Sequence, residues 1–270
     1  MNDKVGENIS EIPELDCEKT KEDIVKFIKS KISESKTNGI VIGLSGGIDS
    51  TLSAYLSCEA VGKENLFGIT LPSATTPTED KLHGIEIAQN LGIEYKEISI
   101  DSILNEYLSA TQLSEDDLAI GNLKARIRMS IIYYFANQKN YLVCGTGNKS
   151  EILIGYFTKH GDGACDMEPI GDLYKTEVFK LSEFIGIPEE IISKPPRAGL
   201  WENQTDESEI GMSYDLLDQI LYLYTEKDMK DNEIAEKLDI SVDNVDMIIN
   251  KIIRNEHKSK VPESPLKTIL

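Results

Sequence analysis

The chain has 270 residues, with 28 Lys and Arg against 47 Asp and Glu, which gives a formal net charge of −19. A free-standing binder of nucleic acid or of an anionic membrane usually carries the opposite charge, so the composition argues against both classes of protein. Hydrophobic residues make up 40% of the sequence and charged residues 28%, which is typical of a globular protein able to bury a full core.

Strands and helices are predicted to alternate along the first half of the chain. Residues 1–20 are polar and mixed and predict a tail or short arm, and a helix is predicted over 20–36 with Thr20 as its N-cap. Short apolar runs predict buried strands at 39–45 and 141–146, and further strands are predicted at 66–72 and 94–100. Helical spacing falls between them, at 50–61, 78–91, 101–110 and 115–138. This alternation predicts an α/β fold with a parallel sheet flanked by helices and an active site at the carboxyl ends of its strands.

The second half of the chain is predicted to be loop-rich and then helical. Residues 147–172 are rich in Gly and Asp, and a loop this long inside a domain is expected to be functional. A helix is predicted over 174–186, an irregular loop over 193–211, and helices over 213–256. We expect residues 1–270 to form one domain with a helical C-terminal part.

The compartment is predicted from the cysteines and from the absence of a targeting segment. No two of the cysteines have CxxC spacing, and none has a histidine at zinc-finger spacing; they are Cys17, Cys58, Cys144 and Cys165. The N-terminal 36 residues contain no apolar signal core, and no apolar run approaches the roughly 20 residues that span a bilayer. We therefore expect a cytoplasmic protein with reduced thiols and no membrane partner.

A glycine-rich turn, SGGIDS over 45–50, lies between the first predicted strand and the following helix. Its glycines let the backbone approach an anion closely, and the N–H groups at the start of the helix favour phosphate. Asp49 is an acid at a phosphate site, which makes sense if it binds Mg²⁺. The alternative is an ordinary strand-to-helix turn, but the full string after a buried strand favours a phosphate loop. The loop lacks the Gly-Lys-Ser/Thr of a Walker A motif.

Four further strings carry candidate binding residues. GNLKARIRM at 121–129 places Arg126 near a helix start, although a solvated amphipathic helix would also explain it. GTGNKSE at 145–151 offers Thr146 to a nucleotide and Glu151 to a metal, while the simpler alternative is a helix capped by Asn148 or Ser150.

The other two strings follow closely in the chain. YFTKHGDG at 156–163, with Asp166 beyond it, offers Lys159 to a substrate, whereas His160 has no evident orienting partner that would make it a general base. In PIGDLYKT at 169–176, Lys175 opens a helix and can reach a phosphate, although a lone lysine there would more often be a surface residue.

Taken in this order, the five strings resemble the ammonia-dependent NAD synthetases, which belong to the N-type ATP pyrophosphatase superfamily. The resemblance runs from about residue 39 to 258 and includes AGLWENQTDESEIGMSYDLLD at 198–218. It implies an adenine-nucleotide α-hydrolase-like fold and an ATP-dependent amidation of deamido-NAD with ammonia, giving NAD, AMP and pyrophosphate through an NAD-adenylate. It also implies a homodimer with the dinucleotide at the interface.

The resemblance assigns site residues by position. The implied ATP contacts are Gly43, Leu44, Ser45, Gly46, Gly47, Ile48, Asp49, Ser50, Thr146, Lys175 and Arg197. The implied deamido-NAD contacts are Arg126, Lys159, Asp166, His257 and Lys258. Asp49 and Glu151 are implied as Mg²⁺ ligands, and Asp49, Lys175 and Asp166 as catalytic residues, with Asp166 and Asp206 as candidate general bases. Relatives usually carry a small hydroxyl residue in place of Arg197, which could instead clamp a phosphate or point away.

Two other functions fit parts of the sequence less well. A tRNA-thiolation enzyme would need pairs of cysteines and a basic RNA-binding surface, and the sequence predicts neither. A DNA-binding regulator is suggested by helix-turn-helix periodicity over 231–254, but acids outnumber bases nine to five over 226–256, which would repel phosphate. About 38 residues precede the first predicted strand, too few for the amidotransferase domain of glutamine-dependent relatives, so we expect free ammonia or a separate glutaminase chain as donor.

Overall fold

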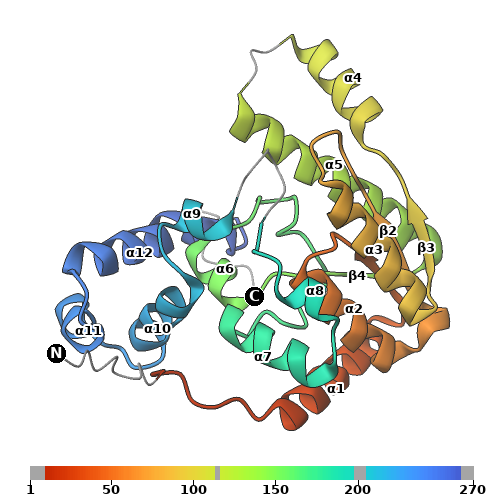
Figure 1. The fold of residues 1–270 in the computed structure, drawn as a ribbon. Coiled ribbons are helices and arrows are strands. Elements are labelled where there is room, and N and C mark those ends of the chain that lie inside the picture. Colours follow the sequence, from red (N-terminus) through yellow and green to blue (C-terminus); the bar gives the residue numbers. More distant parts are fainter. Residues whose placement is uncertain (1–9, 113–115, 198–204, 263–270) are drawn as a thin grey trace.

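The computed structural model describes residues 10–112, 116–197 and 205–262, and its centre is a parallel sheet of four strands (Figure 1). The strands are β1 (Ile40–Gly43), β2 (Leu66–Thr70), β3 (Glu94–Glu97) and β4 (Leu142–Cys144), in the order β3-β2-β1-β4. The predicted parallel sheet is confirmed. Each strand is shorter than its apolar run, because the last residues of the run leave the sheet as connecting loops.

Helices cover both faces of the sheet, as predicted. One face carries α1 (Cys17–Ser35), α2 (Ile48–Val61), α3 (Thr78–Leu91) and α7 (Lys175–Ile185), and the other carries α4 (Asp101–Thr111) and α5 (Asp117–Lys139) (Figure 1). Successive side chains of β1 point to opposite faces, since Ile40 and Ile42 belong to the first core and Val41 to the second. A strand buried on both faces reads as a continuous apolar run, which is why the sequence predicted it well.

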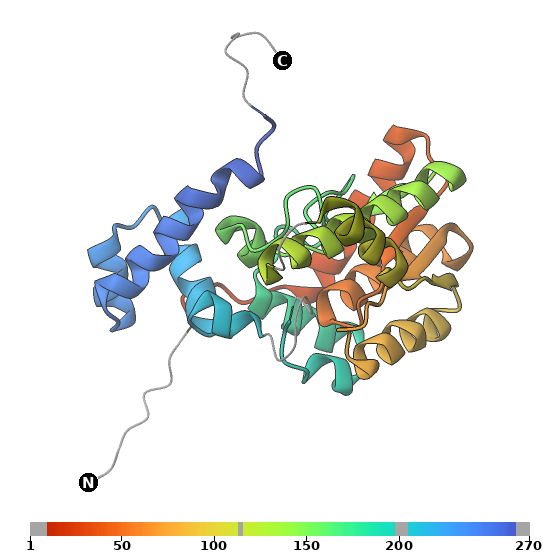
Figure 2. The same cartoon turned by 90° about the horizontal axis from the view of Figure 1, so that it is seen from above.

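The C-terminal helices form a subregion with an apolar core of its own. They are α10 (Tyr214–Thr225), α11 (Asp231–Leu238) and α12 (Val242–Asn255), and they lie beyond α6 and α7 from the sheet (Figures 1 and 2). Tyr174 and Ile12 pack into this core from other parts of the chain. The predicted helical C-terminal part is confirmed. A short turn joins α11 to α12, and the buried side chains of these two helices belong to the same core as those of α10.

Two short helices lie where loops were predicted, and a third lies where no element was predicted. α6 (Lys149–Ile154) falls inside 147–172 and α9 (Asp206–Ile210) inside 193–211, while α8 (Glu189–Ile192) precedes the second of these loops. Helices of four to six residues complete fewer than two turns, so they show no apolar periodicity in the sequence. Two 3₁₀ turns, η1 (Lys63–Asn65) and η2 (Glu256–Lys258), complete the described elements. Part of the NAD synthetase-like string, 198–204, lies outside the described residues.

The predicted start of the first helix was wrong. α1 begins at Cys17, and its N-cap is Asp16, whose carboxylate accepts the Lys19 amide at 3.0 Å, rather than Thr20. Of the two predictions for the preceding segment, residues 10–12 agree with the short arm, because Ile12 is 7% exposed within the C-terminal core and the Glu11 amide donates to the Gln219 side chain at 3.4 Å. Among the described helices, none combines the length and the apolar composition required to cross a bilayer.

Candidate active site

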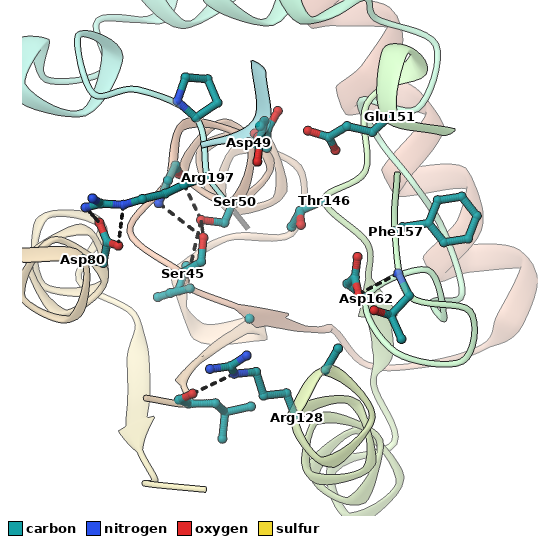
Figure 3. A pocket seen from close by; sticks show the side chains of 18 of the residues that line it. Ser45, Asp49, Ser50, Asp80, Arg128, Thr146, Glu151, Phe157, Asp162 and Arg197 are labelled. Carbon is teal, nitrogen blue, oxygen red and sulfur yellow. Dashed lines mark hydrogen bonds and ion pairs between the residues drawn. The ribbon is translucent and has the colours of Figure 1, made fainter. Parts of the chain in front are cut away.

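The site lies where the strand order changes direction. From β1 the chain continues to β2 and β3 on one side, and returns to place β4 on the other side. The loops leaving β1 and β4 therefore diverge, and in open α/β sheets ligands bind in the crevice that this leaves at the carboxyl ends of the strands. A cavity of about 530 Å³ opens there, lined by the loop after β1, the loop after β4, and residues of α5 and the 194–197 segment (Figure 3).

The phosphate loop has the geometry expected of an anion site. Gly46 has φ +78°, and a Cβ there would lie 2.1 Å from the Asp80 carbonyl oxygen, so only glycine fits. The Ser50 hydroxyl accepts the Ser45 amide at 3.3 Å and lies 3.0 Å from the Ser45 hydroxyl. No side chain caps α2 at Gly47, so the first N–H groups of this helix face the cavity without a side-chain acceptor.

Three charged groups meet beside this loop. The Lys175 ammonium lies 2.5 Å from Asp49 Oδ2 and 3.4 Å from Glu151 Oε1, and the lysine is 1% exposed. Asn148 caps α6 by accepting the Glu151 amide at 3.1 Å, and its side-chain amide donates to Asp49 at 3.0 Å. The predicted cap is therefore confirmed for Asn148, which also binds one member of the acidic pair, while the nucleotide and metal roles of Thr146 and Glu151 stay predictions. Figure 3 shows the Glu151 carboxylate pointing toward Asp49.

This cluster has more negative charge than its lysine balances. Burial alone would lower the pKa of Lys175, but the Asp49 and Glu151 carboxylates beside it raise that pKa above its ordinary value. Burial, together with the charges of Asp49 and Asp206, raises the pKa of the Glu151 carboxyl. Crowded carboxylates of this kind attract a further cation.

The donors present fit Mg²⁺. Within the described ranges, no group of three or more His, Cys, Asp or Glu side chains forms a complete metal site. Asp49 and Glu151 offer two carboxylates facing the cavity, and Mg²⁺ in nucleotide sites is bound by one or two carboxylates with substrate phosphates and water supplying the rest. The same two residues were predicted as the metal ligands.

Most residues implied for ATP line the cavity. They are Gly43, Leu44, Ser45, Gly47, Ile48, Asp49, Ser50, Thr146 and Arg197. Gly46 does not line the cavity, but its carbonyl oxygen accepts the ammonium of Lys194, which does, at 2.7 Å. Lys175 lies behind the carboxylates that it pairs with.

Arg197 is held by a carboxylate on the cavity wall. Its Nε and Nη2 donate to the two oxygens of Asp80 at 3.0 and 2.9 Å, and Lys194 donates to Asp80 Oδ1 at 2.7 Å. Although burial opposes it, this pairing with Arg197 and Lys194 holds the pKa of Asp80 below its ordinary value. Figure 3 shows Arg197 extending toward Asp80 and away from Asp49. Of the two options open from sequence, the side chain thus points to the protein rather than into the site.

Four of the five residues implied for deamido-NAD meet around the loop at 155–160. Arg126 Nε donates to the Lys159 carbonyl at 3.2 Å, and the Lys159 ammonium donates to the His257 carbonyl at 2.7 Å. Lys258 donates to the carbonyls of Gly155 and Phe157 and lines the cavity.

Asp166 is placed differently from the other predicted residues. Its carboxylate accepts the Tyr133 hydroxyl at 3.1 Å and the Val143 amide at 2.7 Å, and it does not line the cavity. The geometry therefore gives no support to a catalytic role for Asp166 beside Asp49 and Lys175, and its contact with deamido-NAD stays a prediction.

Several residues of the site were not predicted from the sequence. Asp80 and Lys194 secure Arg197, and Arg128, which donates to the Leu71 carbonyl at 2.9 Å, lines the cavity from α5. Tyr156 donates to Asp206 at 3.1 Å, so this candidate base lies in a hydrogen-bonded network on the wall. The 121–129 string contains two arginines, two residues apart, and this spacing could have pointed to Arg128 as a second site residue.

Comparisons with known proteins point in one direction. The family model described as NAD synthase matches residues 20–262. The NH₃-dependent NAD⁺ synthetase of Methanocaldococcus jannaschii is 50% identical over 245 residues, which is 90% of this chain and 94% of that protein. Two solved structures are similar over 93% of this chain and 99% of theirs: an NMN synthetase from Francisella tularensis (TM-score 0.83, 33% identity) and an NH₃-dependent NAD synthetase from Campylobacter jejuni (TM-score 0.80, 34% identity).

Proposed function

The chain belongs to the NAD synthase family, and from that premise we propose that it amidates deamido-NAD with ammonia to give NAD, using ATP as co-substrate. The observation that carries the proposal is the meeting of the phosphate loop with the Asp49, Glu151 and Lys175 cluster at the switch point of the sheet. An unpaired helix start, an excess of carboxylates and one buried ammonium together suit a triphosphate that brings a divalent cation.

The chemistry that follows is an adenylation and then an amide formation. A carboxylate is a poor electrophile, so its oxygen attacks the α-phosphorus of ATP, the bond from that phosphorus to the β-phosphate breaks, and pyrophosphate leaves. Ammonia then attacks the acyl carbon, the bond to the AMP oxygen breaks, and one proton is lost. The 45–50 loop holds the phosphates, and Lys175 offsets charge that builds up as pyrophosphate departs. Mg²⁺ held by Asp49 and Glu151 would supply further positive charge there.

The second substrate is proposed to bind where the 155–160 loop meets the C-terminal end of the described chain. Lys258 lines the cavity, and Lys159 and Arg126 extend this basic patch toward the outer face of α5. The diphosphate that joins the two halves of a dinucleotide is anionic, and cations of this kind suit it. Catalysis then comes mainly from holding the two substrates together in the right orientation.

We also propose that the protein is a cytoplasmic homodimer. A groove between α4 and α5 is lined by apolar side chains and by Arg126; it comprises Ile103, Tyr107, Leu123, Arg126, Ile127, Ser130, Ile131 and Tyr134. Tyr107 is 51% and Tyr134 63% exposed, a large apolar area for a monomer surface. A second copy seated on this groove would bring its Arg126 near the substrate patch. All four cysteines are free thiols, which fits the cytoplasm.

One assay tests the proposal. The purified protein is incubated with ATP, Mg²⁺, deamido-NAD and ammonium, and NAD, AMP and ADP are separated by chromatography. We expect NAD and AMP in equal amounts; ADP and phosphate as products would disprove adenylation. Because one structural relative is an NMN synthetase, a parallel reaction with nicotinic acid mononucleotide is included. Preferential turnover of the mononucleotide would change the assigned substrate while keeping the chemistry.

A further inference from the structure

One face of α10 is directed at the charged cluster, although no residue of this helix was predicted to belong to the site. Tyr214 and Asp218 are four residues apart, so they lie on the same side of the helix, and they are 3% and 0% exposed. The Lys175 ammonium lies 5.2 Å from the centre of the Tyr214 ring, within the range of a cation–π contact. The helix thus packs directly behind the lysine that pairs with Asp49 and Glu151.

Asp218 binds the two segments that carry Lys175 and Glu151, the charged residues that lie beside Asp49. Its Oδ1 accepts the Ser150 hydroxyl at 2.5 Å, and its Oδ2 accepts the Thr176 amide at 2.8 Å. The Ser150 oxygen in turn accepts the Lys175 amide at 2.9 Å. One carboxylate therefore holds the first two N–H groups of α7, one directly and one through Ser150.

The same contact fixes a second element. Ser150 is on α6, one residue before Glu151, so the bond from Ser150 to Asp218 ties the start of α6 to α10 as well. Both Ser150 and Asp218 are fully buried, and few water molecules can replace either bond. Loss of the carboxylate would release α6 and α7 at the residues that face Asp49.

We propose that Asp218 is a positioning residue for the reaction: it holds Ser150 and the first turn of α7 so that the Lys175 ammonium and the Glu151 carboxylate converge on Asp49. The inference rests on the proposed function, because it assigns Lys175 and Glu151 to the phosphates and metal of that reaction. An ionised Asp218 at the start of α7 also interacts favourably with the helix dipole. Burial raises the pKa of Asp218 to about 6, so it is ionised in an assay near pH 8.

The test compares three single variants, and the double variant of Asp218→Asn with Ser150→Ala, on the same background. Asp218→Asn keeps the shape and one acceptor but removes the charge and the second acceptor, and Ser150→Ala removes the link to the Lys175 amide. Asp215→Asn is the matched control, because Asp215 lies on the same helix and is exposed. For each variant kcat, KM for ATP and KM for deamido-NAD are measured with saturating ammonium and Mg²⁺, alongside thermal unfolding.

We expect Asp218→Asn to lower kcat by about 10- to 100-fold, since displacing a catalytic group by about 1 Å costs up to 100-fold. KM for ATP should rise and KM for deamido-NAD should stay near the wild-type value, because only the phosphate end of the site is displaced. Ser150→Ala should act in the same direction, and the double variant should be little worse than Asp218→Asn alone, because both act through one relay. If Asp218 had only a structural role, its substitution would lower the unfolding temperature, while kcat and both KM values would stay near those of the wild type.

The outcomes separate the inference from the function. A folded Asp218→Asn with wild-type kcat, or independent and multiplying effects of the two substitutions, would overturn the positioning role alone. If Asp218→Asn does not fold, Ser150→Ala decides, and a wild-type kcat in that variant overturns the role. A wild-type protein that forms no NAD would refute the proposed function, and the inference falls with it.

Discussion

The pair formed by Arg197 and Asp80 allows a quantitative test of how this chain uses its arginine. The two side chains share two hydrogen bonds, at 3.0 and 2.9 Å, and are 28% and 11% exposed. Substituting Arg197→Gln removes the charge and the fork of donors. Asp80 keeps Lys194 at 2.7 Å, so the substitution does not leave a buried carboxylate without a partner.

The coupling between the two residues can be bounded from this geometry. Hydrogen bonds to charged groups contribute about 1.5–3 kcal/mol when well buried, and exposed ion pairs contribute about 0–1 kcal/mol. With Asp80 largely buried and Arg197 partly exposed, we expect a coupling of about 1–2 kcal/mol. For a chain of this size that corresponds to a fall in melting temperature of roughly 2–6 °C.

A double-mutant cycle measures the coupling directly. Arg197→Gln, Asp80→Asn and the double variant are unfolded in urea, and the cycle cancels the separate effect of Asp80→Asn on Lys194. Additivity within about 0.3 kcal/mol would show that the pair contributes nothing and that our assignment of Arg197 is wrong. Kinetics provide the second readout: KM for ATP should stay close to wild type in Arg197→Gln, whereas a large rise would show that Arg197 leaves Asp80 to clamp a phosphate.

Further expected outcomes concern the metal, pH, assembly and backbone. Asp49→Asn should remain folded by circular dichroism and lose most NAD formation, and EDTA should weaken ATP binding by wild type more than by this variant in calorimetry. Burial raises the pKa of Asp218 from its ordinary 3.8 to about 6. Between these two pH values, the folded protein therefore keeps a proton on Asp218 that the unfolded chain has released. Stability should therefore fall by on the order of 2–3 kcal/mol as pH rises from about 4 to about 6, and urea unfolding of Asp218→Asn should lack this component. Tyr134→Glu should shift sedimentation from dimer to monomer, and an unchanged dimer would exclude the α4–α5 groove. Gly155→Ala should destabilise by more than about 1 kcal/mol in the same unfolding assay, because Gly155 has φ +67° and a Cβ there would meet Asn255 at 2.3 Å.

The parts of the fold that were predictable are those with a repeating pattern. β1 and β2 are continuous apolar runs because both faces of the sheet are covered. α6 was missed because its six residues carry no period, although its cap, Asn148, was named from the sequence. The start of α1 was placed three residues late because Asp16 and Thr20 are both acceptable caps, and packing of Ile12 on the C-terminal core helps to decide between them.

The candidate site shows the same difference between residues that belong to a local pattern and residues that do not. Motifs identified many of the residues that line the cavity, because a glycine at φ +78° or an acid beside a phosphate loop has few alternative uses. They did not identify the residues that hold those side chains in place. Asp218 lies 68 residues from Ser150 in the chain, and their contact exists only because α10 packs behind α7. A contact of that kind depends on tertiary packing, which no local pattern in one sequence records.

The net charge of −19 acquires a different meaning once the site is known. It describes the surface well, but the site also has a local excess of acid, since Asp49, Glu151 and Asp206 surround one lysine. Both proposed substrates are anionic, so this arrangement would repel ATP if the cluster acted alone. Under the proposed function, a divalent cation arriving with the triphosphate would offset this excess, and the basic residues Lys258 and Lys159 would serve the other substrate. We therefore propose that the local separation of charge around the site, rather than the overall balance, distinguishes the two substrates.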